Sequence, residues 1–65
     1  MNNERITSAC VHLHKYTNQL NIVWNNPNFS EIDIQPMKMY IECIETALTD
    51  LKEEFEKIKE LEKHD

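Results

Sequence analysis

The sequence predicts an all-α protein, an antiparallel two-helix hairpin that dimerises into a four-helix bundle. In both halves of the chain, apolar residues recur at alternating steps of three and four, the spacing that keeps one helix face against a partner helix. In the first half this seam consists of Ile6, Ala9, Leu13, Tyr16, Leu20 and Val23. In the second half it consists of Met37, Ile41, Ile44, Leu48, Leu51, Phe55 and Ile58. The polar segment Asn25-Asn26-Pro27-Asn28 separates the two halves, in a chain of 65 residues that contains no glycine.

The first helix is expected over residues 3–25. Asn3 can cap the exposed backbone amides at its start. Asn25 tolerates the left-handed conformation that commonly ends helices, and Pro27 disfavours a helical conformation at the residue before it. The turn that follows, residues 26–33, is short enough to force the two helices to pack antiparallel.

The second helix is expected over residues 34–63. Asp33 is the expected N-cap, because Ile32 and Met37 then occupy the two ends of a hydrophobic staple. Ser30 is a competing cap, since Asp33 lies three residues after it as the acidic partner of a capping box. Both alternatives predict the same helix from about residue 34 onward.

Folding the chain at the turn places the two seams face to face, with Leu13 opposite Leu48. The second helix is the longer one, so Ile58 and Leu61 extend beyond the first helix and leave apolar surface without a neighbour. An apolar arc of three positions in seven is typical of a helix that touches two neighbours, as in a four-helix bundle. The side chains that widen the seams into such arcs are Cys10, Thr17, Trp24, Tyr40 and Ala47.

Size and charge restrict the classes of function. A single domain over residues 1–65 buries only about 60% of its extended-chain surface and is marginally stable alone, so self-association is the expected support. Two cysteines, Cys10 and Cys43, do not make a disulfide scaffold, and the expected register places them too far apart for a bridge within one chain. The formal net charge of −5 argues against a nucleic-acid partner.

The longest uninterrupted apolar runs contain three residues, which is too short for a membrane span or for the core of a signal peptide. Free thiols in a chain with no visible export signal indicate a reducing compartment. The sequence therefore predicts a cytoplasmic protein with no membrane partner.

Cys10 and His14 lie four residues apart, on one helix face, at a spacing that two metal ligands can use. A metal site needs three or four ligands, and His12 points away from this pair while His64 lies near the end of the chain. A catalytic Cys–His pair would further need an oriented base, oxyanion donors and a pocket. We therefore expect no metal site, no cofactor and no enzymatic activity.

Large apolar side chains surround the turn, and they either close the open end of the hairpin or form a partner-binding tip. Trp and other aromatic anchors dominate interface hot spots, and methionines suit adaptable contacts. The expected partner-contacting residues near the turn, on the widened seam and on the overhang are Trp24, Phe29, Ile32, Ile34, Met39, Tyr40, Ala47, Ile58 and Leu61.

The leading functional hypothesis is a non-enzymatic protein–protein interaction module. It would be a small intracellular regulator, inhibitor or adaptor of bacterial or phage style, which acts as a helical-bundle oligomer and contacts a further protein. One alternative is a co-chaperone hairpin that docks a helix of a hetero-partner. A second alternative is a metal- or thiol-responsive switch through Cys10 and His14.

Overall fold

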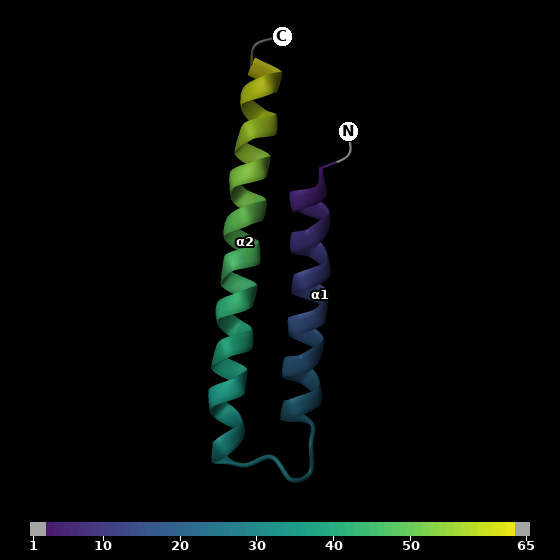
Figure 1. Ribbon diagram of the computed structural model, residues 1–65, viewed down its shortest axis with the longest axis vertical. Coiled ribbons are helices and arrows are strands. Elements are labelled where there is room, and N and C mark those ends of the chain that lie inside the picture. The colour runs from purple at the N-terminus through teal and green to yellow at the C-terminus, as the bar shows by residue number, and fades with distance from the viewer. Residues whose placement is uncertain (1–2, 64–65) are drawn as a thin grey trace.

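The computed structural model describes residues 3–63 and shows two long α-helices joined by a short linker (Figure 1). Helix α1 spans Glu4–Trp24, a single 3₁₀ turn η1 spans Glu31–Asp33, and helix α2 spans Ile34–Lys63. The helices lie side by side and run antiparallel, in a rod with principal extents of 55 × 16 × 13 Å. The predicted helical hairpin is therefore confirmed, with boundaries within one residue of those expected for both helices.

Helix α1 begins as predicted but ends differently. The Asn3 side-chain oxygen accepts hydrogen bonds from the backbone N–H groups of Arg5 and Ile6, at 3.0 and 3.2 Å, which confirms the predicted cap. Asn25 follows the last residue with φ −85° and ψ 0°, so the expected left-handed residue is wrong. The Asn25 side-chain amide donates to the backbone oxygen of Asn21 at 2.8 Å, the same oxygen that accepts from the Asn25 backbone N–H at 3.0 Å.

At the start of α2 the structure shows the competing cap, Ser30. The Asp33 carboxylate accepts a hydrogen bond from the backbone N–H of Ser30 at 2.9 Å, and the Asp33 N–H donates to the Ser30 backbone oxygen at 3.0 Å. Ser30 is thus the cap and Asp33 the third residue after it, so the expected cap at Asp33 is wrong. These two bonds close the turn η1, which leads directly into α2. Pro36 lies in the first turn of α2, where its missing N–H is tolerated.

The face that α1 turns toward α2 is the predicted one. Ala9 is 2% exposed, and the other members of the predicted seam are half-buried, namely Ile6, Leu13, Tyr16, Leu20 and Val23. Residues on the opposite face of α1 are exposed, as shown by Val11 at 59% and Ile22 at 54%. The spacing alone therefore located the inner face of α1 correctly.

The face that α2 turns toward α1 differs from the predicted one. The buried or half-buried row of α2 runs through Met37, Tyr40, Ile44, Ala47, Leu51, Glu54 and Ile58. Tyr40, which was expected on a flank, stacks its ring on Tyr16 with 5.8 Å between centroids, and Ala47 is 2% exposed. Leu48 is 44% exposed, so the expected contact of Leu48 with Leu13 is wrong. The small side chains of Ala9 and Ala47 let the two backbones approach closely, which favours this face of α2 over the bulkier one.

Candidate functional site

One row of large apolar side chains on α2 remains uncovered by α1. It contains every seventh residue and consists of Ile34, Ile41, Leu48 and Phe55, which are 41%, 43%, 44% and 53% exposed. We call these four residues the outer row. They alternate at steps of three and four with the half-buried residues Met37, Ile44, Leu51 and Ile58. These eight residues together form the outer seam, which contains all seven members of the seam that the sequence predicted for the second half of the chain.

The outer row lies on one flank of the contact between the helices. Residues seven apart share a helix flank, because seven residues make nearly two turns. One flank holds Arg5 and His12 of α1 together with Asp50 and Cys43 of α2. Arg5 is hydrogen-bonded to Asp50, and His12 and Cys43 line the same hollow. The opposite flank of α1 carries exposed residues at Cys10, Thr17 and Trp24, next to the outer row of the antiparallel helix. This flank is therefore the wide apolar face of the hairpin, composed mostly of α2.

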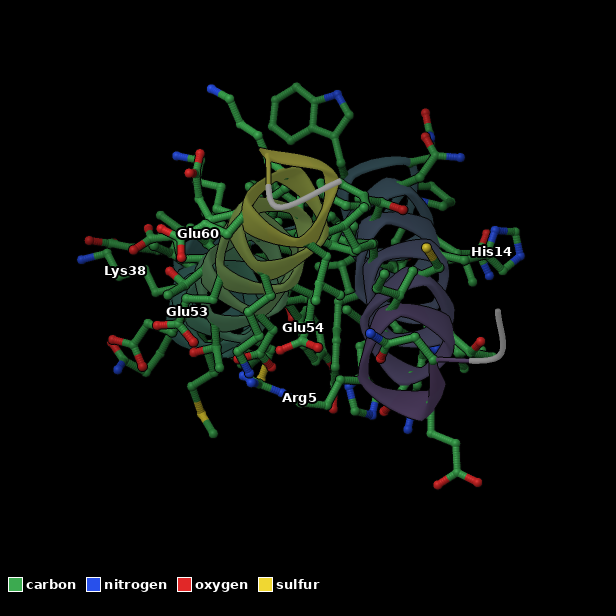
Figure 2. All side chains as sticks on the ribbon, turned by 90° about the horizontal axis from the view of Figure 1, so that it is seen from above. Arg5, His14, Lys38, Glu53, Glu54 and Glu60 are labelled. Atoms are coloured by element: carbon green, nitrogen blue, oxygen red, sulfur yellow. The ribbon has the colours of Figure 1, made fainter. Side chains whose placement is uncertain are left out.

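The other flank holds a cluster of charged side chains around Arg5, the one arginine of the chain. Its guanidinium donates to Asp50 at 2.7 Å, to Glu53 at 3.3 Å and to Glu54 at 2.8 Å. The hydrogen bonds to Asp50 and Glu53 raise the pKa of Arg5 above its ordinary value. Figure 2 shows Arg5 and Glu54 directed toward one another beside the gap between the two helices. The cluster therefore joins the start of α1 to the C-terminal half of α2.

Glu54 is the buried member of this cluster, with 7% of its side chain exposed. Its carboxylate accepts hydrogen bonds from the Asn3 amide at 2.9 Å and from the Lys57 ammonium at 2.9 Å, in addition to the one from Arg5. The bond from Asn3, followed by the bond and the charge of Lys57 and the charge of Arg5, holds the pKa of the Glu54 carboxyl below its usual range, although burial acts in the opposite direction. Through these bonds the Glu54 carboxylate of α2 is tied to the start of α1.

Sequence reasoning missed this cluster. Helical spacing reveals ion pairs three or four residues apart, whereas Arg5 and Glu54 are separated by 49 positions. One signal was available, because Glu54 continues the three–four spacing of Tyr40 and Ala47 and so places a charge within a helix contact. A buried carboxylate requires a cation, which indicates Arg5 at the start of the other helix.

A hollow of about 230 Å³ lies on the charged flank, beside the stacked tyrosines. Its lining consists of His12, Tyr16, Cys43, Thr46, Ala47 and Asp50. Sites for small organic ligands have volumes of roughly 300–1,000 Å³, so this hollow is smaller than they are. Its carboxylate, that of Asp50, is already bound to Arg5 at 2.7 Å. The hollow therefore supports no ligand assignment.

The residues considered for metal binding do not come together. Figure 2 shows His14 directed away from α2, and Cys10, on the same helix, is exposed. Among residues 3–63, no group of three His, Cys, Asp or Glu side chains has a metal-binding arrangement. His64 lies outside the described residues. Cys10 and Cys43 are both free thiols.

The turn end of the hairpin carries exposed apolar side chains in spite of partial packing. Phe29 is half-buried and meets Trp24 edge to face, with 5.2 Å between ring centroids, so it closes part of the open end. Trp24 itself is 64% exposed, Ile32 is 83% exposed and Met39 is 59% exposed. Leu61 at the far end of α2 is 59% exposed. Two of the predicted partner-contacting residues, Tyr40 and Ala47, lie in the contact between α1 and α2. Their expected position on an outer flank is therefore wrong.

Comparisons with protein-family models, with curated proteins and with solved structures found no match to this chain. Within residues 3–63, neither helix has a stretch that is both long and apolar enough to cross a membrane.

Proposed function

We propose that this protein is a non-enzymatic protein–protein interaction module that acts as a dimer of hairpins, joined through the outer seam into a four-helix bundle. The observation that carries the proposal is the exposed outer row at heptad spacing. A row of Ile, Ile, Leu and Phe at every seventh position is the pattern by which a helix packs along a second helix. In α2 this pattern lies on a face that α1 leaves open.

The energetics of burial favour a partner on this face. Fully burying a large apolar side chain is worth about 1.5–3 kcal/mol, so burying the exposed half of one adds about 1 kcal/mol. A symmetric dimer would bury the outer row twice. A lone hairpin of residues 3–63 has just two apolar side chains at 2% exposure, Ala9 and Ala47, and such a core gives little stability without a partner.

A dimer of this kind would act as a small regulator, inhibitor or adaptor, whose output is the binding of another protein rather than a chemical step. The two free thiols suit a reducing cytoplasm. The acidic charged faces outside the outer seam would keep the dimer dispersed in solution, since the net charge of each chain is −5.

The test is a pair of matched double variants in sedimentation equilibrium. Ile41→Gln with Leu48→Gln removes apolar surface from the outer row, whereas Glu42→Gln with Thr49→Gln makes the same replacements one position further along α2, at exposed sites. We expect the wild type and the second variant to sediment at twice the 7.8 kDa of one chain. The first variant should sediment as a monomer. A wild-type monomer at micromolar concentration would overturn the proposal.

A further inference from the structure

We propose that the second copy lies antiparallel to the first, so that the free end of α2 in each hairpin docks on the turn end of the other. This inference rests on the proposed dimer and specifies how its two chains are oriented. The interface would follow a two-fold axis perpendicular to α2, and residue pairs would occur twice across it. Three features of the chain bear on this orientation: the first permits it, and the other two favour it over the parallel one.

The first feature is the symmetry of the outer seam about its own centre. Read from either end of α2, its apolar residues occur at the same positions around residue 46. An antiparallel copy centred there pairs every apolar residue with another apolar residue. The four pairs are Ile34 with Ile58, Met37 with Phe55, Ile41 with Leu51, and Ile44 with Leu48, each formed twice.

The second feature is the overhang of α2. The hydrogen bond of Asn3 to Glu54, at 2.9 Å, places the start of α1 level with Glu54. Helix α2 continues to Lys63, and Figure 1 shows its C-terminal turns extending past the beginning of α1. Leu61 continues the spacing of the inner face, seven residues after Glu54, and is 59% exposed. The overhang thus presents apolar surface on the side where α1 would lie if it were longer.

The third feature is the exposed apolar surface at the turn end, at the opposite end of the rod. In the antiparallel pairing, Leu61 falls level along the bundle axis with the partner's Glu31, one residue before the partner's Ile32. Ile32 is 83% exposed. Trp24, which lies on the flank of the outer row, is 64% exposed. The overhang of one chain and the turn end of the other therefore coincide along the bundle axis.

A parallel pair would place like ends together. Each overhang would then lie beside the other overhang, with no α1 residue on the inner side of Leu61 in either chain. Each α1 would leave the same end of the bundle uncovered. The antiparallel pair instead covers both ends with apolar surface from the partner, and it makes neighbouring helix dipoles antiparallel.

The test is a distance measurement between spin labels, with cysteines at 10 and 43 replaced by serine. A label on Asn28→Cys, at the exposed turn, reports the orientation. In the antiparallel dimer the two labels lie at opposite ends, about 50 Å apart by helix rise. In a parallel dimer they lie about 20 Å apart, within two helix diameters. A label on Glu45→Cys, near the centre of the seam, is the matched control and gives a short distance of about 20 Å in both orientations.

The outcomes separate the two proposals. A long distance for residue 28 with a short one for residue 45 supports the antiparallel dimer. Short distances for both labels overturn this inference and leave the proposed dimer intact. The absence of any measurable distance for both overturns the dimer and the inference together.

A second measurement tests the end contact itself. Leu61→Ala should raise the dissociation constant of the dimer about tenfold, since the lost contact occurs at both ends of a two-fold dimer. Glu60→Ala is the matched control, because Figure 2 shows Glu60 directed away from α1. Equal dissociation constants for Leu61→Ala and the wild type would exclude the overhang from the interface.

Discussion

Glu54 shows how a single residue can determine the face that a helix presents. Its side chain is 7% exposed and lies in the same row as Tyr40 and Ala47, where an apolar residue would be expected. Donors from Asn3, Arg5 and Lys57 all converge on the carboxylate. Rotating α2 to bury Phe55 in its place would take this charge away from Asn3 and Arg5, since only Lys57 lies on the same helix. The cluster therefore fixes the rotation of α2 against α1.

The stability contributed by Glu54 should depend on pH in one direction. Because the folded state lowers its pKa below the ordinary value of 4.5, the contribution is present above about pH 4.5 and is lost as the pH falls through the folded pKa. We expect Glu54→Gln to lower the thermal midpoint at pH 7 and to lose less stability than the wild type between pH 5 and pH 2. Circular dichroism melts over this range provide the measurement.

Glu56→Gln is the control for this experiment, since Glu56 is exposed and the substitution removes the same charge. Its pH dependence should follow that of the wild type. Parallel pH profiles for Glu54→Gln and the wild type would mean that the carboxylate does not stabilise the fold in its ionised form.

The two thiols should remain separate. Cys43 lines the hollow beside His12, whereas Cys10 lies on the opposite flank of α1, in line with Thr17. A disulfide requires Cα atoms within about 7 Å and Cβ atoms that point toward one another. Thiol titration of freshly reduced and desalted protein should count two thiols per chain. A monomer with an internal bridge and undiminished helicity would contradict the observed packing.

At the scale of the helices, α2 has two overlapping seams. The row that faces α1 and the outer seam share Met37, Ile44, Leu51 and Ile58. They differ at the positions between these, which are Tyr40, Ala47 and Glu54 in the row that faces α1 and Ile41, Leu48 and Phe55 in the outer seam. Periodicity measures which side of a helix is apolar, and it selected the more apolar row. It does not identify the neighbour that each row contacts, because that depends on shape and on charges elsewhere in the chain.

Substitutions at adjacent positions should distinguish the two rows. Ala47→Leu inserts three carbon atoms into a close contact and should cost about 1–3 kcal/mol in free energy of unfolding. Leu48→Ala, in protein dilute enough to be monomeric, should cost less than about 1 kcal/mol, because Leu48 is already half exposed. Urea denaturation followed by circular dichroism measures both.

Thr49→Leu is the control, since it adds a similar side chain at an exposed position of the same helix. It should leave the unfolding free energy nearly unchanged. A loss of 2–5 kcal/mol for Leu48→Ala in the monomer, the range for buried leucines, would restore the contact with Leu13 that the spacing first suggested.

The start of α2 depends on a short-range signal. Asp33→Ala removes the acceptor for the Ser30 N–H and should destabilise the hairpin by about 0.5–2 kcal/mol, as for other lost caps. Asp33→Asn keeps an oxygen acceptor at the same place and should cost less. Equal losses in thermal denaturation would show that the negative charge, and not the hydrogen bond, supports the turn η1.

Much of this architecture could be read from local sequence. The cap at Asn3, the inner face of α1 and both helix ranges follow from spacing and from side chains that act on their own helix. The way in which α1 ends could not be predicted from local sequence. The same Asn25 side chain suits a left-handed residue and also the observed bond from its amide to the Asn21 carbonyl. The Arg5 cluster could not be predicted either, since it joins residues that only the folded hairpin brings together.

At the scale of the whole molecule, stability should depend on protein concentration. A chain whose most apolar seam is half exposed gains stability when a second copy covers it, by mass action. We expect the thermal midpoint of the wild type to rise steadily as the concentration is raised a hundredfold. The Ile41→Gln/Leu48→Gln variant should melt at one temperature throughout. A wild-type midpoint that does not move with concentration would contradict self-association through the outer seam.

The short linker between α1 and α2 has a consequence for the order of events in folding. The segment between the helices, from Asn25 to Asp33, brings them together through a loop of a kind that closes in roughly 10–100 ns, and helices of this length form within about 1 μs. Most contacts within the hairpin are then made early, before two chains meet by diffusion. The encounter of two nearly formed hairpins would set the pace of assembly, and refolding would show a fast first-order phase followed by a slower second-order one.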